Sequence, residues 1–300
     1  MREFKRARKA KKVLQCAFTI VFLLVWVNGN ATIKTKHVLF IGNSLTYYNN
    51  MPQTIQKMCD AQKLNIKIDQ QTFAGAMLCE HACYVIDKDF QRHRAEKGEV
   101  PNGVKKILNQ KWDYVILQDA GSKVLNPKYA ELSFEPSLIF LDSLIKRVHA
   151  KTILFEDYAG QEYPRQICFS KMSLNLYMTV VPISSVSNYH DLEGDYCSIY
   201  IKKSDDEYAI IKAEFEKISR KINSGLVKVG YAFYTFKSQH PTIPIYQSHS
   251  DNHPSLQGSY LIACLFYKNI TGNSLKNTKY SAGLNNKQAQ IIRDFADGIK

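Results

Sequence analysis

The chain has 300 residues, of which 45% are hydrophobic and 12% aromatic. This is enough apolar surface for one large α/β domain or two small ones, and it excludes a disordered chain. The formal net charge is +13. Residues 1–12 hold seven Lys and Arg against one Glu, so +13 minus +6 leaves +7 for the rest of the chain. This excess is dispersed, with no arginine-rich or aromatic-interleaved stretch, which argues against a nucleic-acid partner.

The N-terminus has the pattern of a secretory signal peptide. The basic start is followed by an apolar run over residues 13–27, and Gly29-Asn30-Ala31 offers a small–x–small cleavage site. The run is shorter than the roughly 20 residues that span a bilayer comfortably. We therefore expect residues 1–31 to be a signal peptide and the protein to be secreted or periplasmic. An uncleaved signal anchor remains the alternative, and in that case alone do we expect a membrane association.

Strands and helices alternate along the remaining sequence. Apolar runs predict buried strands at residues 37–42, 65–71, 113–118, 151–155 and 226–230. Helical spacing predicts helices at residues 52–64, 104–110, 135–150, 205–224, 255–270 and 286–299. The alternation predicts an α/β fold, a three-layer α/β/α sandwich with a central, mostly parallel, flavodoxin-like sheet. Residues 160–203 give no secure element and are interpreted as an insertion or a lid.

Residues 32–300 are expected to form one domain, because they contain neither repeats nor a low-complexity linker. Six cysteines occur in this part of the chain: Cys59, Cys79, Cys83, Cys168, Cys197 and Cys264. An even number in an exported protein permits disulfides, while buried free thiols are an equally good interpretation. A zinc site is disfavoured, because no second close pair of cysteines accompanies Cys79 and Cys83.

A candidate nucleophile follows the first predicted strand. In an open α/β sheet, functional residues gather just past the carboxyl ends of the strands. The first such exit reads Gly42-Asn43-Ser44-Leu45-Thr46. Ser44 is expected at the start of a helix, where backbone N–H groups can stabilise an oxyanion. The alternative is that Ser44 only caps that helix.

A candidate base lies near the C-terminus, in a polar turn before an apolar helix. The turn reads Ser250-Asp251-Asn252-His253-Pro254. A serine hydroxyl is a weak nucleophile until a base takes its proton, and that base is usually a histidine oriented by a carboxylate. His253 with Asp251 nearby suits this role. A solvated turn histidine is the alternative.

Together the two segments resemble the SGNH (GDSL-like) serine hydrolases. FIGNSLT and DNHPSLQGSYLIACLFYKNITG are similar to the bacterial branch with a GNSxT nucleophile block, and the resemblance spans residues 36–272. It implies that Ser44 is the nucleophile, that its own N–H is one oxyanion donor, and that His253 is the base. It also implies that Gly75 provides a second oxyanion donor, with a plain turn glycine as the alternative.

Two positions depart from the family pattern. The third oxyanion donor is usually an asparagine after the third strand, where this chain has Gln118, whose amide is the natural replacement. The family aspartate usually lies three residues before the histidine, where this chain has Ser250, and Asp251 lies only two before it. Asp251 therefore either completes a triad by a different turn or only accepts local N–H bonds, leaving a Ser–His dyad.

The resemblance implies ester hydrolysis through an acyl-enzyme, with no metal or organic cofactor. Exported members of the family often remove small acyl groups from carbohydrates, so we expect a small-molecule or glycan ester, most often an acetyl ester, as substrate. The alternatives are a lipase or lysophospholipase-like esterase and a degenerate family member that binds a glycan without cleaving it. Tyr231, Phe233, Tyr234 and Tyr246 are candidates for a sugar-binding cleft, with core packing as the other interpretation.

Overall fold

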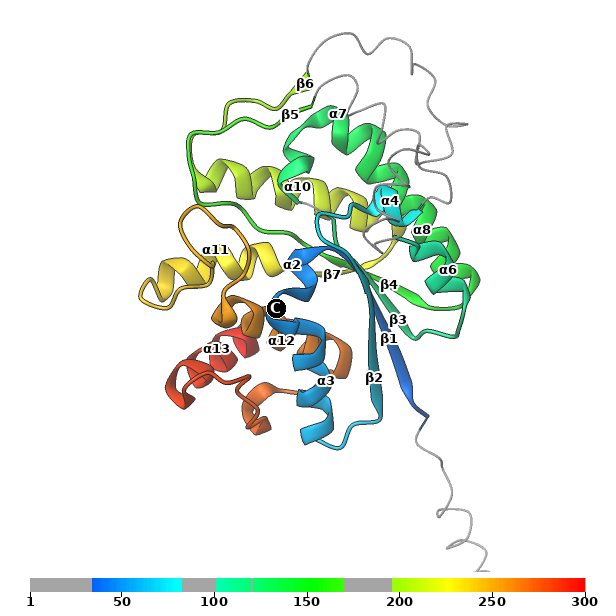
Figure 1. Ribbon diagram of the computed structural model, residues 1–300, viewed down its shortest axis with the longest axis vertical. Helices are drawn as coiled ribbons and strands as arrows, with labels where there is room; N and C mark the ends of the chain where they lie inside the picture. The colour runs from blue at the N-terminus through cyan, green and yellow to red at the C-terminus, as the bar shows by residue number, and fades with distance from the viewer. Residues whose placement is uncertain (1–33, 83–100, 120, 170–195, 300) are drawn as a thin grey trace, which may run out of the picture. The chain divides into compact units, whose positions relative to one another are not determined.

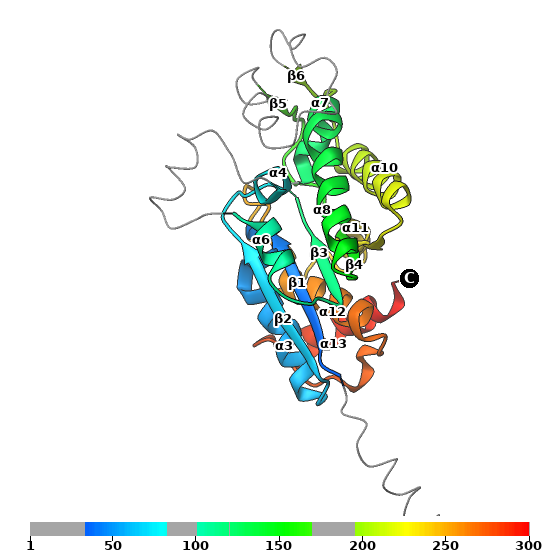
Figure 2. The ribbon, with the colours of Figure 1, turned by 90° about the vertical axis from the view of Figure 1, so that its right-hand side faces the viewer.

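A five-stranded parallel sheet forms the centre of the protein (Figure 1). The structure is a computed structural model that describes residues 34–82, 101–119, 121–169 and 196–299. The strands are β1 (Lys36–Gly42), β2 (Ile66–Thr72), β3 (Tyr114–Leu117), β4 (Lys151–Phe155) and β7 (Gly225–Val227). Their order in the sheet, β2-β1-β3-β4-β7, is the flavodoxin-like order. Figure 2 shows β1, β2 and β3 side by side.

Helices cover both faces of this sheet because its strands are buried on both sides. Val38 and Phe40 point into one apolar cluster, and Leu39 and Ile41 into another, as the alternation of a strand requires. The first cluster includes α3 (Met51–Ala61), α11 (Val229–Gln239), α12 (Leu256–Thr271) and α13 (Asn286–Gly298). The second includes α4 (Leu78–Ala82), α6 (Gly103–Leu108), α8 (Glu135–Arg147) and α10 (Ser204–Ile222). The predicted three-layer sandwich with a parallel sheet is confirmed.

The register of the sheet brings the strand exits together. Gly42 at the end of β1 lies opposite Thr72 of β2, and Ile41 lies opposite Leu117 of β3. Leu117 in turn lies opposite Leu154 of β4. The loops after these strands therefore start at one edge of the sheet, where a site can be assembled from several of them.

Helix α11 was not predicted, and it is the largest difference between the predicted and the observed secondary structure. The fifth strand ends at Val227 rather than at Gly230, and the helix begins at Val229. The buried residues Val229, Ala232, Phe233 and Phe236 are spaced as on one face of a helix. Because this segment is rich in aromatic and β-branched residues, its local preference favours a strand, and packing against the sheet overrides it.

The remaining elements are short. They are α2 (Ser44–Tyr47), η1 (Tyr48–Asn50), η2 (Gly121–Leu125), α7 (Pro127–Tyr129), η3 (Ala130–Phe134), η6 (Leu275–Asn277), β5 (Cys168–Phe169) and β6 (Tyr196–Cys197). Apart from the helix expected to start at Ser44, none of them was predicted, since two to five residues are too few for a periodic pattern.

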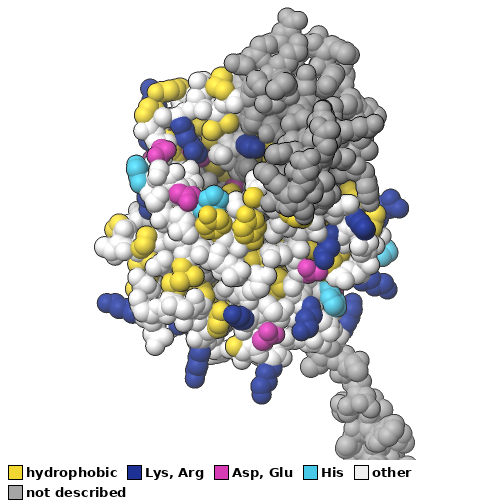
Figure 3. Space-filling model, in the orientation of Figure 1, with side chains coloured by type: hydrophobic (Ala, Val, Ile, Leu, Met, Phe, Trp, Pro, Cys, Tyr) yellow, Lys and Arg dark blue, Asp and Glu magenta, His cyan; other side chains and the backbone are white. Residues whose placement is uncertain are grey.

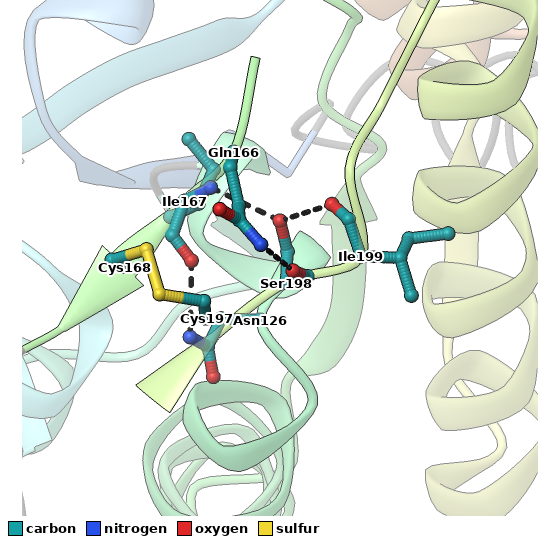
Figure 4. The surroundings of a disulfide bond; sticks show 7 residues. All are labelled: Asn126, Gln166, Ile167, Cys168, Cys197, Ser198 and Ile199. Atoms are coloured by element: carbon teal, nitrogen blue, oxygen red, sulfur yellow. Dashed lines mark hydrogen bonds between the residues drawn. A yellow bond between two sulfur atoms is a disulfide. The ribbon is translucent and has the colours of Figure 1, made fainter. Parts of the chain in front are cut away.

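A disulfide between Cys168 and Cys197 joins β5 to β6 (Figure 4). Next to it, the backbone N–H of Ile167 donates to Oγ of Ser198 at 3.0 Å, and the Nδ2 of Asn126 donates to the carbonyl of Ile167 at 3.2 Å. The middle of the expected insertion, residues 170–195, lies outside the described residues.

Three further cysteines, Cys59, Cys79 and Cys264, are buried free thiols. Burial raises the pKa of Cys59 to about 12, so this thiol is protonated and unreactive. Each interpretation therefore applies to some of the cysteines: two form a disulfide and three are buried thiols. Cys83 lies outside the described part of the chain. The predicted signal segment, residues 1–31, also lies outside it, and no helix among the residues described is long and apolar enough to span a membrane.

Candidate active site

Ser44 is the first residue of α2, and a single residue, Asn43, separates it from the end of β1. The Oδ1 of Asn43 accepts a hydrogen bond from the N–H of Leu45 at 3.0 Å, and its Nδ2 donates to the carbonyl of Ala76 at 2.9 Å. Asn43 therefore caps the helix, and Ser44 does not. The Ser44 hydroxyl is therefore not needed as a cap and can hydrogen-bond to another residue.

Gly42 allows the tight turn before Ser44. A methyl group on its Cα would lie 2.4 Å from Oε1 of Gln118 and 2.9 Å from Oγ1 of Thr46, so the turn accepts no side chain. The Nε2 of buried His81 donates to the Gly42 carbonyl at 3.0 Å. These contacts fix the backbone that carries Ser44.

The structure brings His253 and Asp251 to Ser44. The Nε2 of His253 lies 2.8 Å from Oγ of Ser44, and the Nδ1 of His253 lies 2.6 Å from Oδ1 of Asp251. Because a carboxylate only accepts, Nδ1 carries the proton, and Nε2 is free to accept from the serine. The arrangement has the connectivity of a Ser–His–Asp triad.

Asp251 is held by the turn that it belongs to. Its Oδ1 also accepts from the backbone N–H of His253 at 2.9 Å. This bond, together with the imidazole bond and charge of His253, lowers the pKa of the Asp251 carboxyl below its usual value. The side chain of Asp251 is 41% exposed. Asp251 therefore makes both contacts that the alternatives from the sequence call for, one to the imidazole and one to a local backbone N–H.

Tyr48 packs against the face of the His253 imidazole. The two ring centroids are 4.2 Å apart and the planes differ by 14°. A stacked aromatic ring limits rotation of the imidazole about its side-chain bonds. No local sequence pattern indicates this contact, because a tyrosine in a short turn has many other possible roles.

The surroundings of Gln118 argue against its expected role as an oxyanion donor. Its Oε1 accepts from the N–H of Asn43 at 2.8 Å and from Oγ1 of Thr46 at 2.9 Å. Its Nε2 donates to the carbonyl of Asp119, and the side chain is completely buried. Both the oxygen and the nitrogen of its amide are thus hydrogen-bonded inside the protein. Gln118 therefore stabilises the turn over residues 42–46, which carries Ser44 and is called the nucleophile turn below.

Gly75 lies in an exposed turn after β2, with a φ of +62°. No other atom lies within 4 Å of the position that a methyl group would take there. The positive φ accounts for a glycine at this position. Its role as the second oxyanion donor stays a prediction.

A small cavity of about 70 Å³ is lined in part by the chain neighbours of Ser44 and His253. We call it the Asn252 pocket and define it by six lining residues: Leu45, Ser122, Asp157, Tyr158, Arg165 and Asn252. Leu45 directly follows the serine and Asn252 directly precedes the histidine. Burial raises the pKa of the Asp157 carboxyl, which lies after β4, to about 7.

A larger cavity of about 260 Å³ lies nearby and is lined by Tyr234 and Tyr246. Gly160 borders both cavities. Of the aromatic residues proposed for a sugar cleft, Phe233 is completely buried, whereas Tyr231 and Tyr234 are exposed. Lys and Arg side chains are scattered over the face drawn in Figure 3 rather than gathered in one patch.

Known proteins resemble this chain in structure but not in sequence. No protein-family model matches the chain, and no curated protein is significantly similar to it in sequence. A crystal structure of a DUF4886 family protein from Bacteroides uniformis matches with a TM-score of 0.61 and 15% identity, over 88% of this chain and 94% of that one.

Weaker matches include two hydrolase structures. A putative GDSL-like lipase from Parabacteroides merdae has a TM-score of 0.46 and 15% identity, over 80% of this chain and 98% of that one. A catalytic mutant of Axe2, an acetylxylan esterase from Geobacillus stearothermophilus, has a TM-score of 0.42 and 16% identity, over 80% and 97%. On the first match, this chain has the fold of the DUF4886 family protein over most of its length.

Proposed function

We propose that the protein is a serine esterase, with Ser44 as nucleophile and His253 as general base. One observation carries the proposal: the Nε2 of His253 lies 2.8 Å from Oγ of Ser44 while its Nδ1 is bound to Asp251. A serine, a histidine and a carboxylate in this order are the parts that nucleophilic acyl transfer needs. The fold supports the proposal, because Ser44 follows a strand of the parallel sheet, where functional residues gather.

The proposed reaction has two steps. Oγ of Ser44 attacks the ester carbonyl while its proton passes to Nε2 of His253. The tetrahedral intermediate collapses to an acyl-serine, and the alcohol leaves with the proton from His253. Water then attacks the acyl-serine and gives a proton to Nε2 of His253. As this second tetrahedral intermediate collapses, the bond to Oγ breaks, His253 returns the proton to Oγ of Ser44, and the carboxylic acid is released.

The oxyanion of each intermediate requires N–H donors near Ser44. The backbone N–H of Ser44 is our first candidate, since it lies in the first turn of α2. Gly75 is the second, by its resemblance to the family position. Gln118 is not proposed as the third donor, because its Oε1 accepts from Asn43 and Thr46 and its Nε2 donates to the Asp119 carbonyl.

The size of the Asn252 pocket favours a small ester over a long-chain lipid. A water molecule needs about 10–15 Å³ of such volume, so about 70 Å³ holds only a few heavy atoms beside the serine. We therefore propose a small ester, with acetyl as the first choice of acyl group and a carbohydrate as the alcohol. The lipase-like alternative requires an apolar channel at this position.

Export is supported by the disulfide. Cys168 and Cys197 both lie at exposed positions. An exposed disulfide is kept in an oxidising compartment and is reduced in the cytosol. N-terminal sequencing of the exported protein tests the signal peptide: a mature chain that starts near residue 32 supports cleavage, and an intact Met1 supports an anchor.

The function is tested by hydrolysis of 4-nitrophenyl acetate, butyrate and octanoate. We expect the purified protein to prefer acetate, and we expect Ser44→Ala and His253→Ala each to lose about 10³-fold or more in kcat. Wild-type protein that is folded but cleaves none of the three esters would favour the glycan-binding alternative. A preference for octanoate would favour the lipase-like one.

A further inference from the structure

The Asn252 pocket contains a side-chain amide without a hydrogen-bond partner. The Oδ1 of Asn252 is inaccessible to solvent and accepts no hydrogen bond from any residue that the structure describes. Its Nδ2 likewise donates to none of them. Asn252 as a whole is half-buried, and its Nδ2, which is not enclosed as Oδ1 is, is the atom free to donate to a ligand at the cavity wall.

Arg165 presents further donors at the same wall. Its Nε donates to Oε2 of Glu207 at 2.8 Å, and its Nη2 donates to the other oxygen of the same carboxylate. Glu207 is completely buried and also accepts from the hydroxyl of Tyr163 at 2.7 Å. The guanidinium is thereby fixed in place, and its Nη1 has no partner among the described residues.

The chemistry of this wall points to hydroxyl groups rather than to an anion or a hydrocarbon. The charge of Arg165 is balanced by Glu207, and Asp157 adds a second carboxyl, so the wall has no excess of positive charge for an anionic ligand. Nδ2 of Asn252 and Nη1 of Arg165 donate, and the Ser122 hydroxyl both donates and accepts. A hydroxyl group also does both, whereas an apolar chain would leave all of these groups unpaired.

We propose that the Asn252 pocket binds a hydroxyl-bearing part of the ester substrate, with Asn252 and Arg165 as the specificity-determining residues. This inference rests on the esterase function proposed above. The hydroxyl group can belong to the alcohol, as in a partly acylated sugar, or to the acyl group, as in a hydroxy acid. The pocket is thus the feature that selects against simple alkyl and lipid esters.

The test compares two matched pairs of esters. The first pair, methyl 2-O-acetyl-xylopyranoside and cyclohexyl acetate, differs by hydroxyl groups in the alcohol. The second pair, ethyl lactate and ethyl 2-methylpropanoate, differs by a hydroxyl group in the acyl part. Acid release is followed by pH-stat, and the readout is the ratio of kcat/KM within each pair, compared between wild type and variants so that intrinsic reactivity cancels.

Two variants probe the pocket, and one serves as a control. Asn252→Leu keeps the size of the side chain and removes its polar atoms, and Arg165→Lys keeps a cation beside Glu207 while removing Nη1. We expect each to lower the hydroxyl/non-hydroxyl ratio of one pair about 5-fold or more, as the loss of one hydrogen bond does. Asn269→Leu, at an exposed position of α12, keeps the wild-type ratios.

The outcomes separate this inference from the esterase function. A drop in the first pair assigns the hydroxyl to the alcohol, and a drop in the second assigns it to the acyl group. Active enzyme whose ratios are the same in wild type, Asn252→Leu and Arg165→Lys overturns the pocket inference and leaves the esterase function standing. Folded protein that hydrolyses no ester and is not labelled at Ser44 by a fluorophosphonate overturns both.

Discussion

The imidazole of His253 lies 2.8 Å from the hydroxyl of Ser44, although the two residues are 209 positions apart. The contact depends on the sheet. Ser44 follows the strand β1, and His253 precedes the buried helix α12, which packs on the same sheet. The N-cap of α12, Ser255, accepts from the N–H of Gly258 at 3.0 Å and fixes the start of that helix two residues after the histidine.

Asp251→Asn tests whether the aspartate completes a triad. The asparagine can turn its Nδ2 toward Nδ1 of His253 and favour the wrong tautomer, so we expect kcat for 4-nitrophenyl acetate to fall about 10- to 10³-fold. The loss should be smaller than for Ser44→Ala, because Asp251 is 41% exposed and water can replace part of its role. Ser250→Ala is the control at the position where the family usually has its aspartate. Wild-type activity of Asp251→Asn would establish a Ser–His dyad.

Tyr48 is expected to position His253 through ring stacking. Tyr48→Ala removes the ring that lies 4.2 Å from the imidazole, and we expect kcat to fall about 10-fold with little change in KM. Tyr48→Phe keeps the ring and should restore most of the rate. Equal losses in both variants would assign the effect to the hydroxyl group instead of to stacking.

Gln118 is expected to stabilise the nucleophile turn rather than the transition state. Gln118→Ala removes the acceptor of Asn43 and Thr46 and leaves a cavity, so we expect a loss of about 2–4 kcal/mol in the free energy of unfolding. Thermal unfolding should show a clear drop in Tm together with any loss of rate. A normal Tm with kcat reduced about 10²-fold or more would instead show that Gln118 donates to the oxyanion.

Glu156 is expected to make stability depend on pH. It is completely buried, its Oε2 has no partner within the described part of the chain, and burial raises its pKa to about 7. In the unfolded chain the carboxyl titrates near its ordinary value of 4.5. Between these two pKa values the folded state therefore holds a proton that the unfolded state has lost. The contribution of Glu156 to the free energy of unfolding is complete below about pH 4.5 and disappears as the pH rises through about 7.

The variant Glu156→Gln removes this dependence. Its amide oxygen keeps the bond from the Tyr231 N–H, which Oε1 accepts at 2.9 Å in the wild type. We expect equal Tm values at pH 5 and a variant more stable by about 1–3 kcal/mol at pH 8. Glu162→Gln, at an exposed position, is the control and should match the wild type at both pH values. A variant less stable at pH 8 would show that the buried group is held as a carboxylate.

Much of the fold follows from local sequence patterns. The strands β1 and β4 are short apolar runs with turn residues at their ends, and α10 has acidic residues in its first turn and basic residues in its last. Helix α11 was missed because its aromatic residues favour a strand locally. The disulfide could not be predicted either, because its two cysteines are 29 positions apart and the spacing of cysteines does not determine their pairing.

The sequence located the candidate nucleophile and base but not the groups around them. Ser44 and His253 were found through short polar turns next to buried elements. The orientation of Gln118 depends on which hydrogen bonds its amide makes across 75 positions, and no local pattern encodes that. Asn252 and Arg165 become candidates only when the structure shows that they line one cavity, and that Nη1 of Arg165 and Oδ1 of Asn252 make no hydrogen bond to a described residue.

The most direct test of the esterase account is labelling with a fluorophosphonate, followed by mass spectrometry of the modified peptide. The account predicts that the wild type is labelled at Ser44, that Ser44→Ala takes up no label, and that His253→Ala is labelled much more slowly. Folded wild-type protein that takes up no label, or takes it up at a serine other than Ser44, would contradict it.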